Sequence, residues 1–286
     1  MAAPLGGRSV TTVGEIEREL SSLRSPGDGA EPAMRTSVMT HLAWVPDEWL
    51  PAAHEVLSGL AERHPSRTIV LVPQPDAEDG MEAEVSQQDF PLAGSERSIC
   101  TETIELRLGG EFVSRPASIV APLLIADLPV FCRWRGEPPW GGGELEQLVD
   151  LVDRLVVDSR EWREPAAGYA RATEVFDRVA LSDIAWSVIQ DWRLALAKLW
   201  PAIGEAEIAV RGPAAEASLL HGWLSARLRR DLPPVEYADE LDVRLDGEAV
   251  SPLRSEPRSP AELLSEELDK FSRDKIYEEA VRAAAS

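Results

Sequence analysis

The segment Thr68-Ile-Val-Leu-Val72 is the feature that most constrains how this chain can fold. Its five uncharged residues show no polar alternation, which is typical of a parallel strand covered on both faces. Residues 34–45 are predicted to form an earlier strand that ends at Pro46, and residues 48–63 a helix capped by Asp47. Together these segments predict a β-α-β unit, whose connection is right-handed in nearly all sheets.

Further elements extend this unit into an α/β domain. Ile104, Leu106 and Leu108 alternate with Glu105 and Arg107, which predicts a strand with one solvated face. The pattern predicts strands at 99–108, 128–132 and 155–158, and helices at 13–24, 114–121 and 144–152. We therefore expect a helix and linker over 1–33, then a mixed, mostly parallel sheet flanked by helices over 34–170.

A second, smaller α/β unit is expected over residues 171–286. Its predicted elements are a helix at 183–200, a strand at 207–211, a helix at 214–229 and a strand at 241–245. Ser182 or Asp183 is the expected N-cap of the first helix, and Asp246-Gly247 is a hairpin signal. An amphipathic C-terminal helix is predicted to bury Leu263, Leu264, Leu268 and Phe271.

The chain is strongly acidic, with a formal net charge of −21 at pH 7. Nucleic acids and anionic membranes are bound through clusters of Lys and Arg, so this charge argues against both as partners. Residues 74–96 hold seven of the acids and no Lys or Arg, and we expect a solvated acidic loop there.

The two cysteines, Cys100 and Cys132, indicate a reducing compartment, because secreted frameworks use more. With no apolar run long enough to span a bilayer and no signal-like N-terminus, we expect a cytoplasmic location. The two thiols could approach each other if strands 99–108 and 128–132 were neighbours. The favoured interpretation is two buried, reduced thiols.

No motif for catalysis or for a cofactor is visible. None of the four histidines has a second His or Cys at metal-ligand spacing, so we predict no metal site. Gly141-Gly-Gly143 lacks the spacing of a phosphate loop, and no Gly-x-Ser-x-Gly occurs. These observations favour a protein that is not an enzyme. Two alternatives stay open, namely a nucleotide- or nucleotide-sugar-binding α/β enzyme and a stand-alone small-molecule sensor.

Five residues are candidates for contact with a partner protein. Arg133, Trp134 and Arg135 follow the strand predicted at 128–132, and Trp beside Arg is typical of interface hot spots. The alternative is that Trp134 fills the core and the arginines pair with acids of the same chain. His64 and Arg67 flank Pro65-Ser66, where they either serve the turn or hold an anion or a partner carboxylate.

Several motifs occur together in the order found in a known family. They are Met34-Arg-Thr-Ser37, Arg63-His-Pro-Ser-Arg-Thr-Ile-Val70, Leu128-Pro-Val-Phe-Cys-Arg-Trp-Arg-Gly136, Asp153-Arg-Leu-Val-Val-Asp-Ser159 and Asp183-Ile-Ala-Trp186. With these the chain resembles the OpcA family of glucose-6-phosphate dehydrogenase assembly proteins. The resemblance implies a non-catalytic protein that binds glucose-6-phosphate dehydrogenase, promotes its active oligomer and so supports NADPH supply by the oxidative pentose phosphate pathway.

Overall fold

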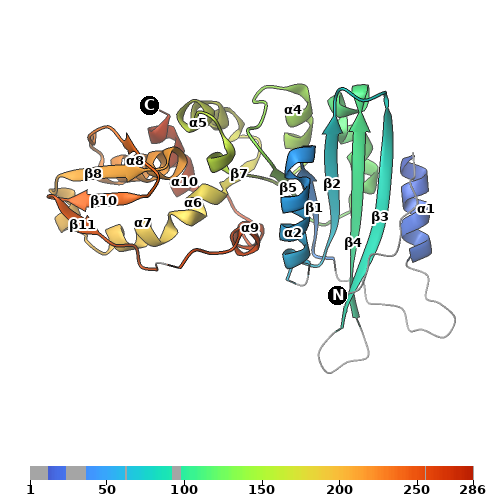
Figure 1. Ribbon diagram of the computed structural model, residues 1–286, viewed down its shortest axis with the longest axis horizontal. Helices are drawn as coiled ribbons and strands as arrows, with labels where there is room; N and C mark the ends of the chain where they lie inside the picture. Colours follow the sequence, from blue (N-terminus) through green and yellow to red (C-terminus); the bar gives the residue numbers. More distant parts are fainter. Residues whose placement is uncertain (1–11, 24–36, 62, 92–97, 255, 286) are drawn as a thin grey trace. The chain divides into compact units, whose positions relative to one another are not determined.

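The computed structural model describes residues 12–23, 37–61, 63–91, 98–254 and 256–285 (Figure 1). The chain divides into two compact units, residues 1–155 and 156–286. The sequence pattern had suggested a division at residue 170. The segment after residue 155 belongs to the second unit because the backbone N–H of Ser159 donates to Asp183 and the Tyr169 hydroxyl donates to the carbonyl oxygen of Ala215.

The first unit is built around parallel strands. Its elements are α1 (Val13–Leu23), β1 (Met39–Trp44), α2 (Leu50–Leu60), β2 (Ser66–Gln74), β3 (Gly80–Pro91), β4 (Ser98–Gly109), α3 (Pro116–Val120), β5 (Val130–Trp134), α4 (Gly143–Val149) and β6 (Arg154–Val157). Strands β1, β2, β4 and β5 run parallel, and β3 pairs with β4 antiparallel. The strand order in this unit is β3-β4-β2-β1-β5-β6. A mixed, mostly parallel sheet flanked by helices is therefore confirmed.

The apolar run in β2 lies at the centre of this unit, as its composition predicts. Val70 and Val72 pack with Ala43 of β1, with Val45 just after β1 and with Leu50 and Ala53 of α2, and all six side chains are buried. Ile69 and Leu71 point to the opposite face and are also fully buried. Both faces of β2 are thus covered, which explains why its sequence shows no polar alternation.

The predicted acidic loop at 74–96 is wrong over most of its described length. Residues 80–91 form the edge strand β3, paired with β4 from Gly80 to Pro91. Met81, Ala83 and Val85 are buried whereas Glu82 and Glu84 are exposed, so the segment has the two-residue period of a half-buried strand. The high acid content obscured that period, and charged side chains on an exposed edge also discourage pairing with other chains.

Two helices in the structure have other bounds than the sequence predicts. Residues 47–49 form a single 3₁₀ turn before α2, and Asp47 does not cap the helix because its carboxylate accepts hydrogen bonds from Arg107 and Gln74. The helix predicted at 183–200 is interrupted at Ile189 and forms two shorter helices. Asp183 is its N-cap, accepting a hydrogen bond from the backbone N–H of Ala185 at 2.9 Å.

The second unit is a smaller α/β body, as expected. Its elements are α5 (Pro165–Ala172), β7 (Ala180–Asp183), α6 (Ile184–Val188), α7 (Gln190–Ala197), β8 (Ile208–Gly212), α8 (Ala214–Leu228), β9 (Glu236–Tyr237), β10 (Asp242–Leu245), β11 (Glu248–Val250), α9 (Pro260–Leu268) and α10 (Lys275–Ala284). Strands β8–β11 form a second sheet in the order β11-β10-β8-β9. Asp246-Gly247 makes the predicted hairpin, with Leu245 opposite Glu248.

The C-terminal region departs from the prediction at one residue. Leu263, Leu264 and Leu268 of α9 are buried, but Phe271 follows the end of this helix and is 70% exposed. A further helix, α10, then packs against α8, and Gly222 lies so close to it that an added Cβ would meet the backbone oxygen of Ala280 at 2.3 Å. None of the helices among the described residues combines the length and apolar character needed to cross a membrane.

Candidate functional site: a cleft at the carboxyl edge of the sheet

The carboxyl ends of three parallel strands meet at one edge of the first unit. Trp44, the last residue of β1, is in register with Leu71 of β2 and with Trp134 of β5. The loops that leave these strands lie side by side, at the place where open α/β sheets bind ligands. The structure has a cavity of about 920 Å³ there, lined by residues 44, 46–49, 73–77, 113, 134–137, 139 and 144. We call this cavity the carboxyl-edge cleft.

Tryptophan side chains form a rigid apolar part of the cleft. The rings of Trp44 and Trp134 stack with 4.7 Å between their centroids and 11° between their planes, and both are buried. The strand register causes this contact, since directly opposite residues on adjacent strands project to the same face. The Arg135 guanidinium carbon lies 4.5 Å from the centroid of the Trp49 ring, a cation–π contact. The aromatic surface is therefore held in place by the fold.

The charged residues that line the cleft are mostly acidic. Its carboxylates belong to Asp47, Glu48, Asp76, Glu137 and Glu144. Among the described residues that line it, Arg135 is the single basic side chain. The carboxylate of Asp47 is engaged by its own chain, with Oδ1 accepting from Nη1 of Arg107 at 3.0 Å and Oδ2 from Nε2 of Gln74 at 3.1 Å. Glu48 and Asp76 are exposed at the cleft and have room for a ligand.

The five residues predicted to contact a partner lie at two ends of the sheet. Arg133, Trp134 and Arg135 are at the carboxyl end of β5, whereas His64 and Arg67 are at the amino end of β2. Thr40 of β1 pairs with Arg67, and Trp44 pairs with Trp134. These two residue pairs are four residues apart along β1, a distance of about 13 Å at ~3.3 Å per residue. The structure therefore does not bring the five side chains into one surface patch.

Four of these five side chains are buried. Arg67 is 3% exposed; its Nε donates to Glu102 Oε2 at 2.9 Å and its Nη1 to the carbonyl oxygen of Leu123 at 2.6 Å. Arg133 is also 3% exposed, and its Nη1 donates to the carbonyl oxygen of Trp134. His64 and Trp134 are buried as well. Trp134 and the half-buried Arg135 line the cleft, so these two stand at the candidate site.

Sequence reasoning missed several residues of the cleft, including Trp44, Trp49, Glu48 and Asp76. A signal was available, because each of them ends or follows a predicted strand, and parallel strands end at the same edge. His41, three residues before Trp44 on β1, does not line the cleft. Its side chain is buried, and burial together with nearby His64 and Arg133 lowers the pKa of His41 to about 4. His41 is thus a neutral core residue beneath the site at neutral pH.

The two cysteines do not lie on neighbouring strands. Cys100 belongs to β4 and Cys132 to β5, and β2 and β1 lie between them in the sheet. Adjacent strands are about 4.8 Å apart, so a disulfide between these positions is geometrically excluded. Cys132 is a free, buried thiol, and burial raises its pKa to about 12. A thiol with so high a pKa is a poor nucleophile at neutral pH.

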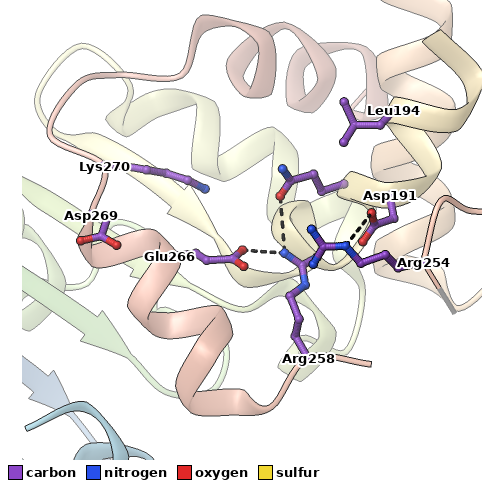
Figure 2. A pocket seen from close by; sticks show the side chains of 8 residues that line it. Asp191, Leu194, Arg254, Arg258, Glu266, Asp269 and Lys270 are labelled. Atoms are coloured by element: carbon purple, nitrogen blue, oxygen red, sulfur yellow. Dashed lines mark hydrogen bonds and ion pairs between the residues drawn. The ribbon is translucent and has the colours of Figure 1, made fainter. Parts of the chain in front are cut away.

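A second cavity, of about 330 Å³, lies within the second unit (Figure 2). Its charged side chains are directed at one another: Nη1 of Arg258 donates to Glu266 Oε2 at 2.6 Å, and Nε of Arg254 lies 3.9 Å from Asp191 Oδ1. Lys270 pairs with the buried Glu267 at 2.7 Å. Because the bases are matched by acids of the same region, this cavity has little net charge to offer a ligand. The carboxyl-edge cleft is the stronger candidate.

No cluster of three or more His, Cys, Asp or Glu suited to a metal ion is present among the residues that the structure describes. The match to a protein family concerns mainly the first unit. Residues 58–174 match the family described as "Glucose-6-phosphate dehydrogenase subunit N-terminal domain". This segment contains β2 and β5 and thus two of the three strands that end at the cleft.

Three cyanobacterial proteins, each named OxPP cycle protein OpcA, are similar to this chain. The protein from Nostoc punctiforme is 29% identical over 193 residues, the one from Synechocystis 26% over 192 and the one from Synechococcus elongatus 25% over 194. Each alignment covers 63% of this chain, but only 41%, 40% and 43% of the relatives. The chain thus spans about two fifths of the length of the relatives it matches.

Proposed function

From the family match and the similarity to the three OpcA proteins, we propose that this chain belongs to the OpcA family and is an assembly factor for glucose-6-phosphate dehydrogenase that supports the oxidative pentose phosphate pathway and NADPH supply. The observation that carries the proposal is the match of residues 58–174 to a family described by that enzyme. In the proposed role the chain is not itself an enzyme, and it acts in the cytoplasm together with the dehydrogenase.

The proposed mechanism is a shift between quaternary states of the dehydrogenase. If the assembly factor binds the active oligomer more tightly than the inactive form, it moves the population toward the active oligomer by mass action. A tenfold shift requires about 1.4 kcal/mol of differential binding free energy. One or two well-placed side chains at an interface supply that amount, so no catalytic residue is required for activation.

The proposed contact surface is the carboxyl-edge cleft. Of the five residues predicted from the sequence, Arg135 and Trp134 line it, and we assign direct contact with the dehydrogenase to Arg135. Arg133 and Trp134 are both buried, and their proposed role is to support the loop that carries Arg135. His64 and Arg67 are placed at the other end of β2, where their proposed role is to hold the sheet that presents the cleft.

The experiment combines the purified full chain with the dehydrogenase from the same source. Light scattering after size exclusion should show a complex and a larger share of the active oligomer. Steady-state kinetics should show a higher rate or a lower apparent KM. The chain alone should not reduce NADP with glucose 6-phosphate. Unchanged kinetics at saturating concentration, without co-migration, would contradict the proposal.

A further inference from the structure

The carboxyl-edge cleft has a composition that selects among possible ligands. Open α/β sheets commonly bind nucleotides or other phosphates at this edge, using glycine-rich turns and basic side chains. Here the lining offers carboxylates from Glu48, Asp76, Glu137 and Glu144 and one guanidinium, that of Arg135. Coulomb repulsion from these carboxylates disfavours a phosphate in the cleft. The same carboxylates favour a group with positive charge.

The apolar part of the cleft suits a side chain of a polypeptide. Trp44, Trp49 and Trp134 lie beside Pro46, Pro73, Pro75 and Pro139. The stack of Trp44 on Trp134 and the contact of Arg135 with Trp49 fix all three rings before any ligand binds, and the half-buried Trp49 is the ring that remains accessible. Prolines have little backbone freedom to lose. A preformed surface of this kind loses little entropy when it buries an apolar side chain.

On these observations, and resting on the proposed function, we propose that the carboxyl-edge cleft binds a cationic segment of the dehydrogenase. That segment carries a Lys or Arg next to an aliphatic or aromatic side chain. The cation meets the exposed carboxylates of Glu48 and Asp76, and the apolar side chain packs on the ring of Trp49. Asp47 is not a contact, since Arg107 and Gln74 occupy its carboxylate.

The test compares two double variants, one in the cleft and one outside it, and each replaces two acidic side chains by lysines. Glu48→Lys with Asp76→Lys changes the cleft, and Asp239→Lys with Glu240→Lys changes an exposed loop in the second unit. Titration calorimetry against the intact dehydrogenase should show about tenfold weaker binding for the cleft variant and nearly unchanged binding for the loop variant. Affinity of the wild type should fall with added salt, and this dependence should be smaller for the cleft variant.

Each outcome decides between the two proposals. If the wild type does not bind the dehydrogenase, the proposed function fails. If the wild type binds and both variants bind equally well, or are weakened equally, the cleft is not the cationic site although the assembly role stands. Glucose 6-phosphate or inorganic phosphate that changes tryptophan fluorescence in the wild type, and loses that effect in Trp49→Ala, would also overturn the cleft proposal.

Folding of the variants is checked separately. Circular dichroism and melting curves of the charge-reversed chains should match those of the wild type, because no other residue that the structure describes forms a hydrogen bond or ion pair with the carboxylates of Glu48 and Asp76. If Glu48→Lys with Asp76→Lys does not fold, Glu48→Gln with Asp76→Asn keeps the shape and removes the charge. Binding of that neutral pair should still be several-fold weaker than that of the wild type, and unchanged binding would contradict the proposal.

Discussion

The guanidinium of Arg135 lies 4.5 Å from the centre of the Trp49 ring, and the backbone N–H of Arg135 donates to the carbonyl oxygen of Trp44 at 2.9 Å. Arg135 thus joins the ends of β1 and β5 and orients an aromatic ring in the cleft. The chain turns away at once, because Gly136 has a φ of +79°, a conformation that favours glycine.

Replacing Arg135 by Ala should release the Trp49 ring and weaken binding to the dehydrogenase about fivefold, the equivalent of ~1 kcal/mol. Loss of one positive charge by itself would strengthen attraction for a cationic segment, so weaker binding reports on the direct contacts of Arg135 and on the position of the Trp49 ring that it orients. The free energy of unfolding should stay within about 1 kcal/mol of the wild type. Calorimetry and urea unfolding measure the two quantities.

A matched control for this variant is Arg171→Ala, which removes the same charge from an exposed position on α5. Binding by Arg171→Ala should equal that of the wild type. Tighter binding by Arg135→Ala would show that charge outweighs the orientation of Trp49, and equal binding would remove Arg135 from the contact surface.

Arg67→Ala should destabilise the fold without a specific effect on binding. Removing one partner of the buried Arg67–Glu102 ion pair takes the positive charge of Arg67 away from the buried Glu102 carboxylate and costs about 3–5 kcal/mol. Arg67→Met with Glu102→Leu should recover much of that loss, since neither charge remains. Urea unfolding gives the stabilities, and calorimetry on the folded fraction gives the affinity. A stable Arg67→Ala chain that no longer binds the dehydrogenase would place Arg67 in the interface after all.

Cys132 should not act as a redox switch. Its buried thiol, with a pKa raised to about 12 by burial, should react with a thiol reagent only after the chain unfolds. Replacing Cys100 and Cys132 by Ser should therefore leave the response of dehydrogenase activation to oxidant unchanged. Reagent uptake by the native chain, followed by mass spectrometry, is the second measurement. Rapid labelling of Cys132, or an oxidant response that disappears in the double variant, would contradict this prediction.

Asp183 should make the second unit less stable as pH rises from about 4 to 7. Burial, followed by the nearby charge of Asp158, raises the pKa of its carboxyl to about 7. The folded state then keeps a proton that the unfolded chain releases near pH 4, so this stabilising contribution is complete at low pH and is lost as pH rises from about 4 to 7. Each pKa unit corresponds to about 1.4 kcal/mol.

Asp183→Asn removes the titration but keeps an oxygen to accept from the backbone N–H groups of Ser159 and Ala185. The free energy of unfolding of this variant minus that of the wild type should rise by on the order of 2–3 kcal/mol from pH 5 to pH 8. Urea unfolding of both chains at the two pH values gives the comparison. A difference between the chains that does not change with pH would show that Asp183 ionises normally in the fold.

Local sequence patterns determined much of the secondary structure. The uncharged run Thr68–Val72, the helix at 13–23 and the hairpin at Asp246-Gly247 were all predicted, because their periodicity or turn chemistry is contained in neighbouring residues. The strand at 80–91 was missed although its alternation was present. Its acids resembled a solvated segment, and only pairing with β4 distinguishes a charged edge strand from a loop.

The carboxyl-edge cleft was decided by the tertiary structure. Trp44 and Trp134 are ninety residues apart in the sequence, and the residues next to each of them do not predict that their rings stack. That contact depends on β1 lying between β2 and β5 and on the register that sets Trp44 opposite Trp134. The same register placed His64 and Arg67 at the far end of the sheet. Strand order and register follow from the free energy of the whole buried core, to which each strand contributes only a part.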